Sequence, residues 1–189
     1  EEANLLPDEH EINIEYNKFL SQFGDEGNLI ILGIKDSTLF TPSKFKAWNN
    51  LTTKIDSYEA VDFSISIGDL KKLKKREDTT AFELVPFIQD SVFTKKSLER
   101  YRYELLNKLP FYEGLVYSPN KKSFRAGIYL KKDIVNTPAR KNFILNDLIP
   151  LINEFEKENN LKVRTSGMPY IRTLNAKNII DEIGMFVGA

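Results

Sequence analysis

The sequence predicts an α+β fold in which helices cover one face of an antiparallel sheet. A unit made of a strand, a helix that starts with Thr-Pro and a second strand occurs twice, and the two Thr-Pro pairs lie about 96 residues apart. In each unit one strand alternates between apolar and polar residues, so it buries a single face. Two units of this kind supply four strands and two covering helices.

The first unit spans residues 28–67. Its first strand, 29–34, is short and apolar on both faces, which favours a central strand over a helix. Thr41 and Pro42 are typical of a helix start, and an apolar stripe continues to residue 56. The strand at 61–67 alternates, so we expect one face to meet the core through Val61, Phe63, Ile65 and Ile67.

The second unit lies within residues 114–167. We expect a hairpin of 114–118 with 123–130, then a helix from Thr137-Pro138, then a strand at 163–165. Pro150 falls inside this helix and predicts a kink, because proline removes a backbone donor. Together the units predict a ferredoxin-like split β-α-β sheet backed by two helices.

The remaining segments are expected to be helical. Residues 68–113 form a helical insertion between the two halves, with a short basic helix at 69–77 and a longer helix at 95–109. Residues 1–27 contain an expected helix at 9–23, and residues 168–189 an expected helix at 172–187. No low-complexity linker divides the chain, so we predict one domain over residues 1–189.

Composition excludes several classes of chemistry. The 27 basic and 27 acidic residues balance, so there is no global attraction to nucleic acid or anionic lipid. The chain has no cysteine and one histidine, His10, which excludes disulfides, thiolate metal sites and a cysteine nucleophile and makes a Ser-His triad hard to build. The nine glycines are scattered and form no phosphate-binding loop. We therefore predict no catalytic residue, no metal, no cofactor and no nucleic-acid partner.

Two sets of side chains are candidates for binding. Aromatic residues of the insertion either pack a satellite core or line an apolar substrate groove; they are Phe82, Phe87, Phe93, Phe111 and Tyr112. The outer face of the predicted sheet is polar yet carries an aromatic residue, so it is either wet or meets another domain; its residues are Ser64, Ser66, Arg125, Tyr129 and Arg164.

One basic block stands out in this neutral chain, at residues 71–76. A solvated helix face explains it, and contact with phosphates or acidic headgroups is the alternative.

The order of short motifs resembles the first extracytoplasmic loop of resistance-nodulation-division (RND) superfamily exporters, especially the MMPL-type and Patched-like branch. The matching stretches span nearly the whole chain: Leu5-Leu6-Pro7-Asp8, Phe23-Gly24, Asn28-Leu29-Ile30-Ile31, Leu39-Phe40-Thr41-Pro42 and Ser166-Gly167-Met168-Pro169. In that family the loop joins two transmembrane helices and folds as a porter domain of ferredoxin-like units.

The resemblance implies a domain in the periplasm, within a bacterial inner-membrane exporter of lipidic or amphiphilic molecules that the proton-motive force drives. The partners would be the rest of the transporter, including a second loop domain, the exported molecule, and the membrane through both flanking segments. The family's proton-relay residues lie in membrane helices, so none is carried over to this chain. The chain opens without Met and closes on an increasingly apolar run, so we expect an excised piece whose two ends lie on one face, with the terminal helices side by side.

Two other functions stay open. One is a soluble ligand-sensing or protein-interaction domain, because ferredoxin-like sheets host many unrelated functions. The other is a small acylphosphatase-like hydrolase, which needs a phosphate cradle after the first strand, and residues 35–38 do not supply one.

Overall fold

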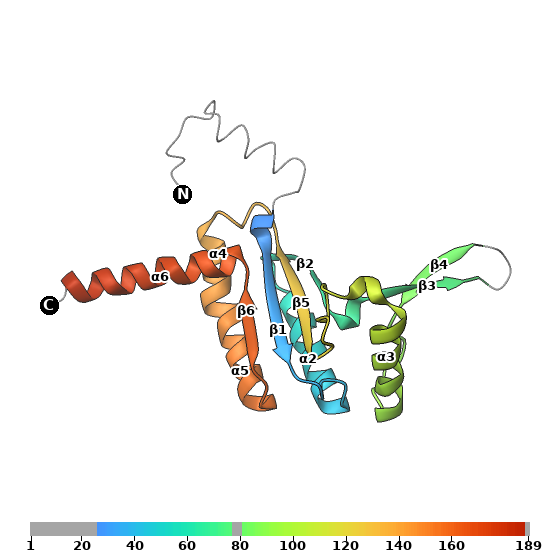
Figure 1. Ribbon diagram of the computed structural model, residues 1–189. Helices are drawn as coiled ribbons and strands as arrows, with labels where there is room; N and C mark the ends of the chain where they lie inside the picture. Colours follow the sequence, from blue (N-terminus) through green and yellow to red (C-terminus); the bar gives the residue numbers. More distant parts are fainter. Residues whose placement is uncertain (1–25, 77–80, 188–189) are drawn as a thin grey trace.

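A computed structural model describes residues 26–76 and 81–187 (Figure 1). The chain folds as an α+β protein with a mostly antiparallel sheet. The expected helix at 9–23 lies outside the described residues, and so does the expected placement of the two chain ends side by side.

The main sheet has four strands in the order β2-β5-β1-β6. Their bounds are β1 (Leu29–Lys35), β2 (Val61–Ile65), β5 (Ser123–Leu130) and β6 (Val163–Ser166). β1 is antiparallel to both β5 and β6, and β2 is antiparallel to β5. It follows that β1 runs parallel to β2, and β5 parallel to β6. The segments at Val61 and Phe124, expected in one sheet, do share one.

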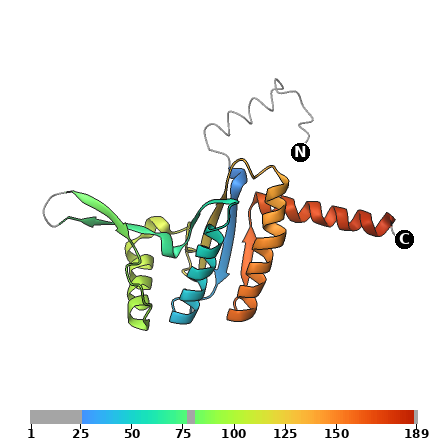
Figure 2. The ribbon, with the colours of Figure 1, turned by 180° about the vertical axis from the view of Figure 1, so that it is seen from behind.

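Each parallel pair is joined by a helical crossover. α2 (Pro42–Asp56) joins β1 to β2, with the predicted bounds. The second crossover is α4 (Pro138–Asn142), the π-helical η4 (Phe143–Leu148) and α5 (Ile149–Asn159). Figure 2 shows α2 and α5 side by side on one face of the sheet, whereas Figure 1 looks onto the face that they leave open.

The core lies between the sheet and these two helices. β1 and β5 alternate between buried and half-buried residues, so each strand turns one face inward. The inward residues meet the apolar stripes of the helices, and all five residues of the predicted α2 stripe are buried: Phe45, Trp48, Leu51, Thr52 and Ile55. Trp48 contacts Phe155 of α5 edge-on, with ring centroids 6.2 Å apart, which ties the two crossovers together.

The prediction that Phe63 and Ile65 face the core is wrong. The pairing of β2 with β5 shifts between Val61 and Phe63, which places Phe63 opposite Tyr129. Because an irregularity of one residue moves every later side chain to the other face, Phe63 and Ile65 point away from the helices. Phe63 is 43% exposed, while Val61 before the shift and Ile67 after the strand are buried.

A π-helical turn lies just before Pro150, the position at which the sequence predicts a kink. The Ile149 amide donates to the Ile144 carbonyl, five residues back rather than four. A π turn widens the helix locally, which is one way of accommodating a proline that lacks a donor.

The insertion is not wholly helical, so that part of the prediction is wrong. Residues 71–76 form no helix: β3 (Lys71–Lys75) pairs with β4 (Phe82–Pro86) in a separate two-stranded sheet. With Leu73 as the one apolar residue among five, the segment has no helical apolar stripe, and its pairing with β4 decides its structure. The longer helix is confirmed as α3 (Lys95–Lys108), which begins at a Thr94–Ser97 capping box.

Short elements complete the chain: the 3₁₀ turns η1 (Glu26–Asn28), η2 (Ile67–Asp69) and η3 (Pro110–Tyr112). The strand expected at 114–118 is reduced to isolated bridges, including that of Tyr117 with Phe124. Figure 1 shows the β3–β4 hairpin projecting from one side of the molecule and α6 (Met168–Val187) from the other. No helix among residues 26–76 and 81–187 combines the length and apolar character needed to cross a membrane.

Candidate functional site

The open face of the main sheet is the most distinctive surface of the described chain. Cross-strand partners in an antiparallel pair share a face, so the register defines which residues lie there. The apolar members are Leu29 and Ile31 of β1, Phe63 and Ile65 of β2, and Tyr129 of β5. In Figures 1 and 2, α2 and α5 both lie on the other face of the sheet, so neither of these helices covers this one. The open face therefore carries a group of apolar residues beside its polar ones, whereas a fully solvated sheet face would be polar throughout.

An apolar depression of about 180 Å³ lies on this face. Its floor comes from the sheet and its wall from the loop after η3, and the lining residues are Leu29, Ile31, Ile65, Tyr112, Gly114, Leu115, Val116, Arg125, Gly127 and Tyr129. Leu115 is 65% exposed at its edge. Gly127 leaves room at the centre, because a Cβ there would meet Leu29 and Tyr129 side chains at 3.4 and 3.6 Å. The depression is smaller than the roughly 300 Å³ at which small-molecule pockets begin.

Two polar groups are held in fixed positions beside the depression. The Arg125 guanidinium donates to the Gly114 carbonyl at 2.7 Å, which ties the wall to the floor. The Tyr129 ring stacks on Phe63 with centroids 4.4 Å apart and an angle of 16° between the planes. Because both side chains are restrained before any partner arrives, little conformational entropy is lost when one binds.

The structure places three of the five residues predicted for the outer face on that face and two on the other side of the sheet. Arg125, Tyr129 and Arg164 lie there, since Arg164 pairs with Gly33 in the outward register. Ser64 and Ser66 do not. Ser64 pairs with Ile128 on the helix-covered face, and Ser66 is buried as the N-cap of η2, with its hydroxyl 2.7 Å from Asp69. The same shift in β2 that exposes Phe63 moves these serines inward.

The five aromatic residues predicted to line a groove do not gather at one place. Phe87 is fully buried against Tyr101, so it belongs to the core, and Phe93 packs on Phe45 at 4.9 Å. Phe82 is exposed on the hairpin. The Phe111 and Tyr112 rings are in contact, with centroids 4.1 Å apart and planes tilted by 41°. Of the five, only Tyr112 lines the sheet-face depression. The structure therefore does not bring these five side chains together, and Phe87 and Phe93 follow the alternative in which aromatic residues of the insertion pack a core.

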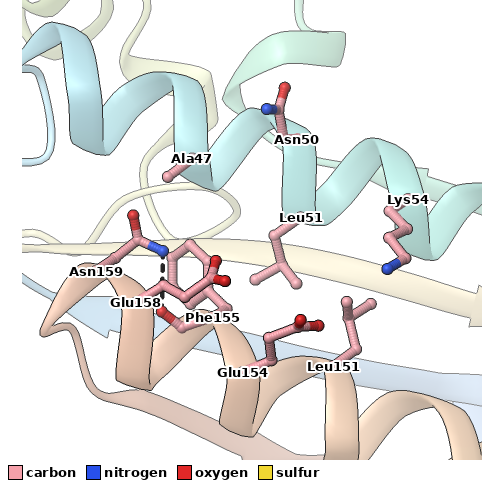
Figure 3. A pocket seen from close by; sticks show the side chains of 9 residues that line it. All are labelled: Ala47, Asn50, Leu51, Lys54, Leu151, Glu154, Phe155, Glu158 and Asn159. Atoms are coloured by element: carbon pink, nitrogen blue, oxygen red, sulfur yellow. Dashed lines mark hydrogen bonds between the residues drawn. The ribbon is translucent and has the colours of Figure 1, made fainter.

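A second concave surface lies on the opposite side, between α2 and α5 (Figure 3). Leu51, Leu151 and Phe155 form the floor of this groove of about 320 Å³, and its rim carries Lys54, Glu154 and Glu158. Charges of both signs line the rim, and the Asn159 amide is already satisfied by the Phe155 carbonyl at 2.9 Å. We read it as a solvated groove between two packed helices, without a preference for one ligand class.

The titratable groups with shifted pKa values hold loops in place. Partial burial acts to raise the pKa of Asp36, but hydrogen bonds from Lys44 and Thr38 outweigh it and lower that pKa. Hydrogen bonds from Lys162 and the Val163 amide lower the pKa of Glu156. Burial, with the nearby Glu113, raises the pKa of Tyr117. Asp36, Tyr117 and Glu156 line neither the depression on the sheet face nor the groove between α2 and α5.

The described residues contain no group of three or more histidine, cysteine, aspartate or glutamate side chains placed to hold a metal ion. Four apolar residues of the sheet-face depression were not predicted as site residues from the sequence: Leu29, Ile31, Ile65 and Leu115. The apolar run of β1 could have signalled it, because a strand that is apolar on both faces needs a cover on both.

No protein-family model matches this sequence, and a search of curated proteins finds no significant match either.

Proposed function

We propose that this chain is a periplasmic porter-type domain of an RND superfamily exporter of the MMPL-type and Patched-like branch. In this proposal the proton-motive force drives export of lipidic or amphiphilic molecules by the whole transporter in a bacterial inner membrane. The domain itself does no chemistry. It guides substrate and moves against a second loop domain of the same transporter, with the open sheet face as the contact surface.

The topology supports the finer fold assignment within this proposal. The order β2-β5-β1-β6, with two crossovers on one face, supports a ferredoxin-like split β-α-β sheet as part of this proposal. A porter domain of ferredoxin-like units is what the sequence resemblance implies.

The single observation that carries the proposal is the open apolar sheet face. A depression of about 180 Å³ is too small for most whole amphiphiles but accommodates one large side chain of a partner. Restrained Tyr129 and Arg125 beside it are residue types enriched at protein interfaces. A second domain seated here would move as a rigid body against the sheet, which is how such folds change access.

The projecting helix α6 is consistent with the same arrangement. Its residues 175–182 are exposed, and Ile179 and Ile180 are each 57% exposed. An exposed helix with apolar residues gains stability when another surface covers them, and the membrane or the second domain would do so in the intact transporter.

Export by the intact transporter tests this proposal. Ile31→Glu places a charge in the centre of the open face, and Asn50→Glu places the same charge on the exposed side of α2 as its control. We expect proton-driven efflux of a fluorescent amphiphile to fall about tenfold or more with Ile31→Glu and to stay within twofold with Asn50→Glu. Circular dichroism of both 189-residue variants checks that the fold persists. Efflux that is absent from the unaltered protein, or equal in the two variants, would falsify the proposal; a parent protein found only in the soluble fraction would favour the sensing or interaction domain.

A further inference from the structure

The β3–β4 hairpin presents an apolar face that nothing in the described chain covers. In antiparallel strands directly paired residues share a face, so Leu73 with Leu84 and Lys75 with Phe82 lie on one side of the ribbon. Leu73, Phe82 and Leu84 are 68%, 63% and 67% exposed, which places them among the most exposed large apolar side chains described. Because Leu73 pairs with Leu84 and Phe82 neighbours Leu84 on the same face of β4, the three side chains form one patch and are not scattered single exposures.

The body of the protein fixes the base of this hairpin. The Tyr112 hydroxyl donates to the Lys71 carbonyl at 2.7 Å and accepts from the Lys71 amide at 3.2 Å. The Phe87 amide donates to the Leu70 carbonyl at 2.8 Å, and the Phe87 ring is buried. The ribbon therefore leaves the body in a defined direction, as Figure 1 shows.

The two faces of the ribbon have different surroundings. On one face Lys72 is half-buried, forms an ion pair with Glu104 of α3 at 2.8 Å and lies over the Phe87 ring. Val85, its cross-strand partner, is half-buried too. The opposite face carries the exposed apolar residues. The body of the molecule thus covers one face near its base and leaves the other free.

Lysines stand at both ends of the exposed apolar face. Lys71 and Lys75 share it, because they alternate with Leu73 along β3. Both are exposed, and no carboxylate among the described residues forms an ion pair with either side chain. Glu83 lies on the other face, opposite Lys74. Among the described residues 71–75 and 82–86, the exposed face therefore has an apolar centre with cationic ends and no acidic residue.

We propose that this hairpin face docks on an anionic lipid bilayer, with Leu73, Phe82 and Leu84 in the headgroup region and Lys71 and Lys75 on lipid phosphates. Lysine stems can lie along an apolar surface while the ammonium groups stay at the polar boundary. Each lysine near an anionic membrane surface strengthens binding about fivefold.

A bilayer suits this face better than a protein partner does. A standard protein interface uses about 20–30 residues a side, whereas this face offers six. A lipid surface needs no shape complementarity, and its negative charge complements the lysines. Since the chain as a whole has no net charge, the attraction arises locally from these lysines.

A fluorescent probe on alternate residues of β4 tests the proposal directly. The chain has no cysteine, so a single introduced cysteine takes an environment-sensitive dye at one position only. Leu84→Cys reports on the exposed face, and Glu83→Cys, the adjacent residue on the other face, is its control. With vesicles of 30% phosphatidylglycerol in phosphatidylcholine, we expect dye emission to rise at least twofold at position 84 and much less at position 83. Pure phosphatidylcholine vesicles should change neither.

Charge variants test whether the lysines of this hairpin, and not basic residues elsewhere in the chain, strengthen binding to the vesicles. In the Leu84→Cys background, Lys71→Gln with Lys75→Gln should raise the lipid concentration for half-maximal response about 25-fold. Lys95→Gln with Lys96→Gln, in the first turn of α3, is the matched control and should leave it unchanged. An equal response at positions 83 and 84, no response to the anionic vesicles, or no effect of the Lys71 and Lys75 changes overturns the proposal. So does a change at position 84 that depends on protein concentration without vesicles, because that result indicates a protein partner.

Discussion

The two crossover units share one plan but hold their strands and helices together differently. In the first, Asp36 and Lys44 close the turn between β1 and α2, and Thr41 makes no side-chain cap to its helix. In the second, Thr137 caps α4 through the Ala139 amide, a π turn precedes Pro150, and Glu156 fixes the passage into β6. The same sequence signature, Thr-Pro, therefore marks a helix start without specifying which contact stabilises it.

Replacing one glycine in each unit by alanine should give the largest difference in the free energy of unfolding. Gly167 ends β6 with φ of +118°, and a Cβ there would lie 2.2 Å from the Leu29 carbonyl oxygen. Gly167→Ala should lower the free energy of unfolding by about 2–4 kcal/mol, because both the backbone and β1 must shift. Gly33→Ala is the matched change in β1, where a Cβ meets only ordinary contacts near 3.8 Å, and should alter that free energy by less than about 1 kcal/mol. Urea unfolding of the two variants measures the difference, and equal losses would contradict it.

Acid should destabilise both units through their carboxylates. The folded-state pKa values of Asp36 and Glu156 lie below their ordinary values of 3.8 and 4.5. Their stabilisation is thus complete above about pH 5 and is lost as pH falls through the lowered values. Asp36→Asn and Glu156→Gln should each cost about 1 kcal/mol at pH 7 and flatten the fall below pH 4.5. Urea unfolding at pH 7, 4 and 3 checks this, and a pH dependence unchanged in both variants would count against it.

The two Thr-Pro helix starts have the same sequence, but replacing their threonines should change the free energy of unfolding by different amounts. The Thr137 hydroxyl accepts from the Ala139 amide at 3.3 Å, so Thr137→Ala should cost about 1 kcal/mol. Thr41 makes no such bond, so Thr41→Ala should cost only a few tenths. Thermal unfolding compares the two, and a larger loss at Thr41 would show that the caps are assigned wrongly.

Replacing the lysines that pair with Asp36 and Glu156 should give the smallest difference in the free energy of unfolding. Lys44 is 32% exposed and donates to both Asp36 and Thr38, whereas Lys162 is 89% exposed beside Glu156. Lys44→Met should cost up to about 1 kcal/mol, and Lys162→Met close to nothing, because solvent screens the exposed pair. A larger loss of stability for Lys162→Met than for Lys44→Met in denaturant unfolding would contradict this ranking.

Much of this fold follows from sequence periodicity, as particular elements show. Three predictions are confirmed: the apolar stripe of α2, the helix α3 and the strand at Val163. The spacing of apolar residues in each of these segments fits one type of secondary structure better than the other. The irregularity in β2 has no sequence signal, so Phe63 and Ile65 were assigned to the wrong face. The basic helix predicted at 69–77 is wrong because the strand at Lys71–Lys75 depends on pairing with β4, a long-range interaction that local propensity does not show.

The candidate site was predictable only in part for the same reason. Arg125, Tyr129 and Arg164 follow from simple alternation in regular strands. Leu115 reaches the depression through a loop, and its contribution depends on tertiary packing that no spacing encodes.

Photo-crosslinking in the intact protein tests the central claim, that the open sheet face is a contact surface and the helix-covered side is not. A photoreactive amino acid at Ile31 samples the depression, and one at Asn50 samples the groove between α2 and α5. We predict that position 31 crosslinks to a second domain of the same polypeptide and that position 50 does not. Crosslinks from position 50 alone, or none from position 31, would contradict the account.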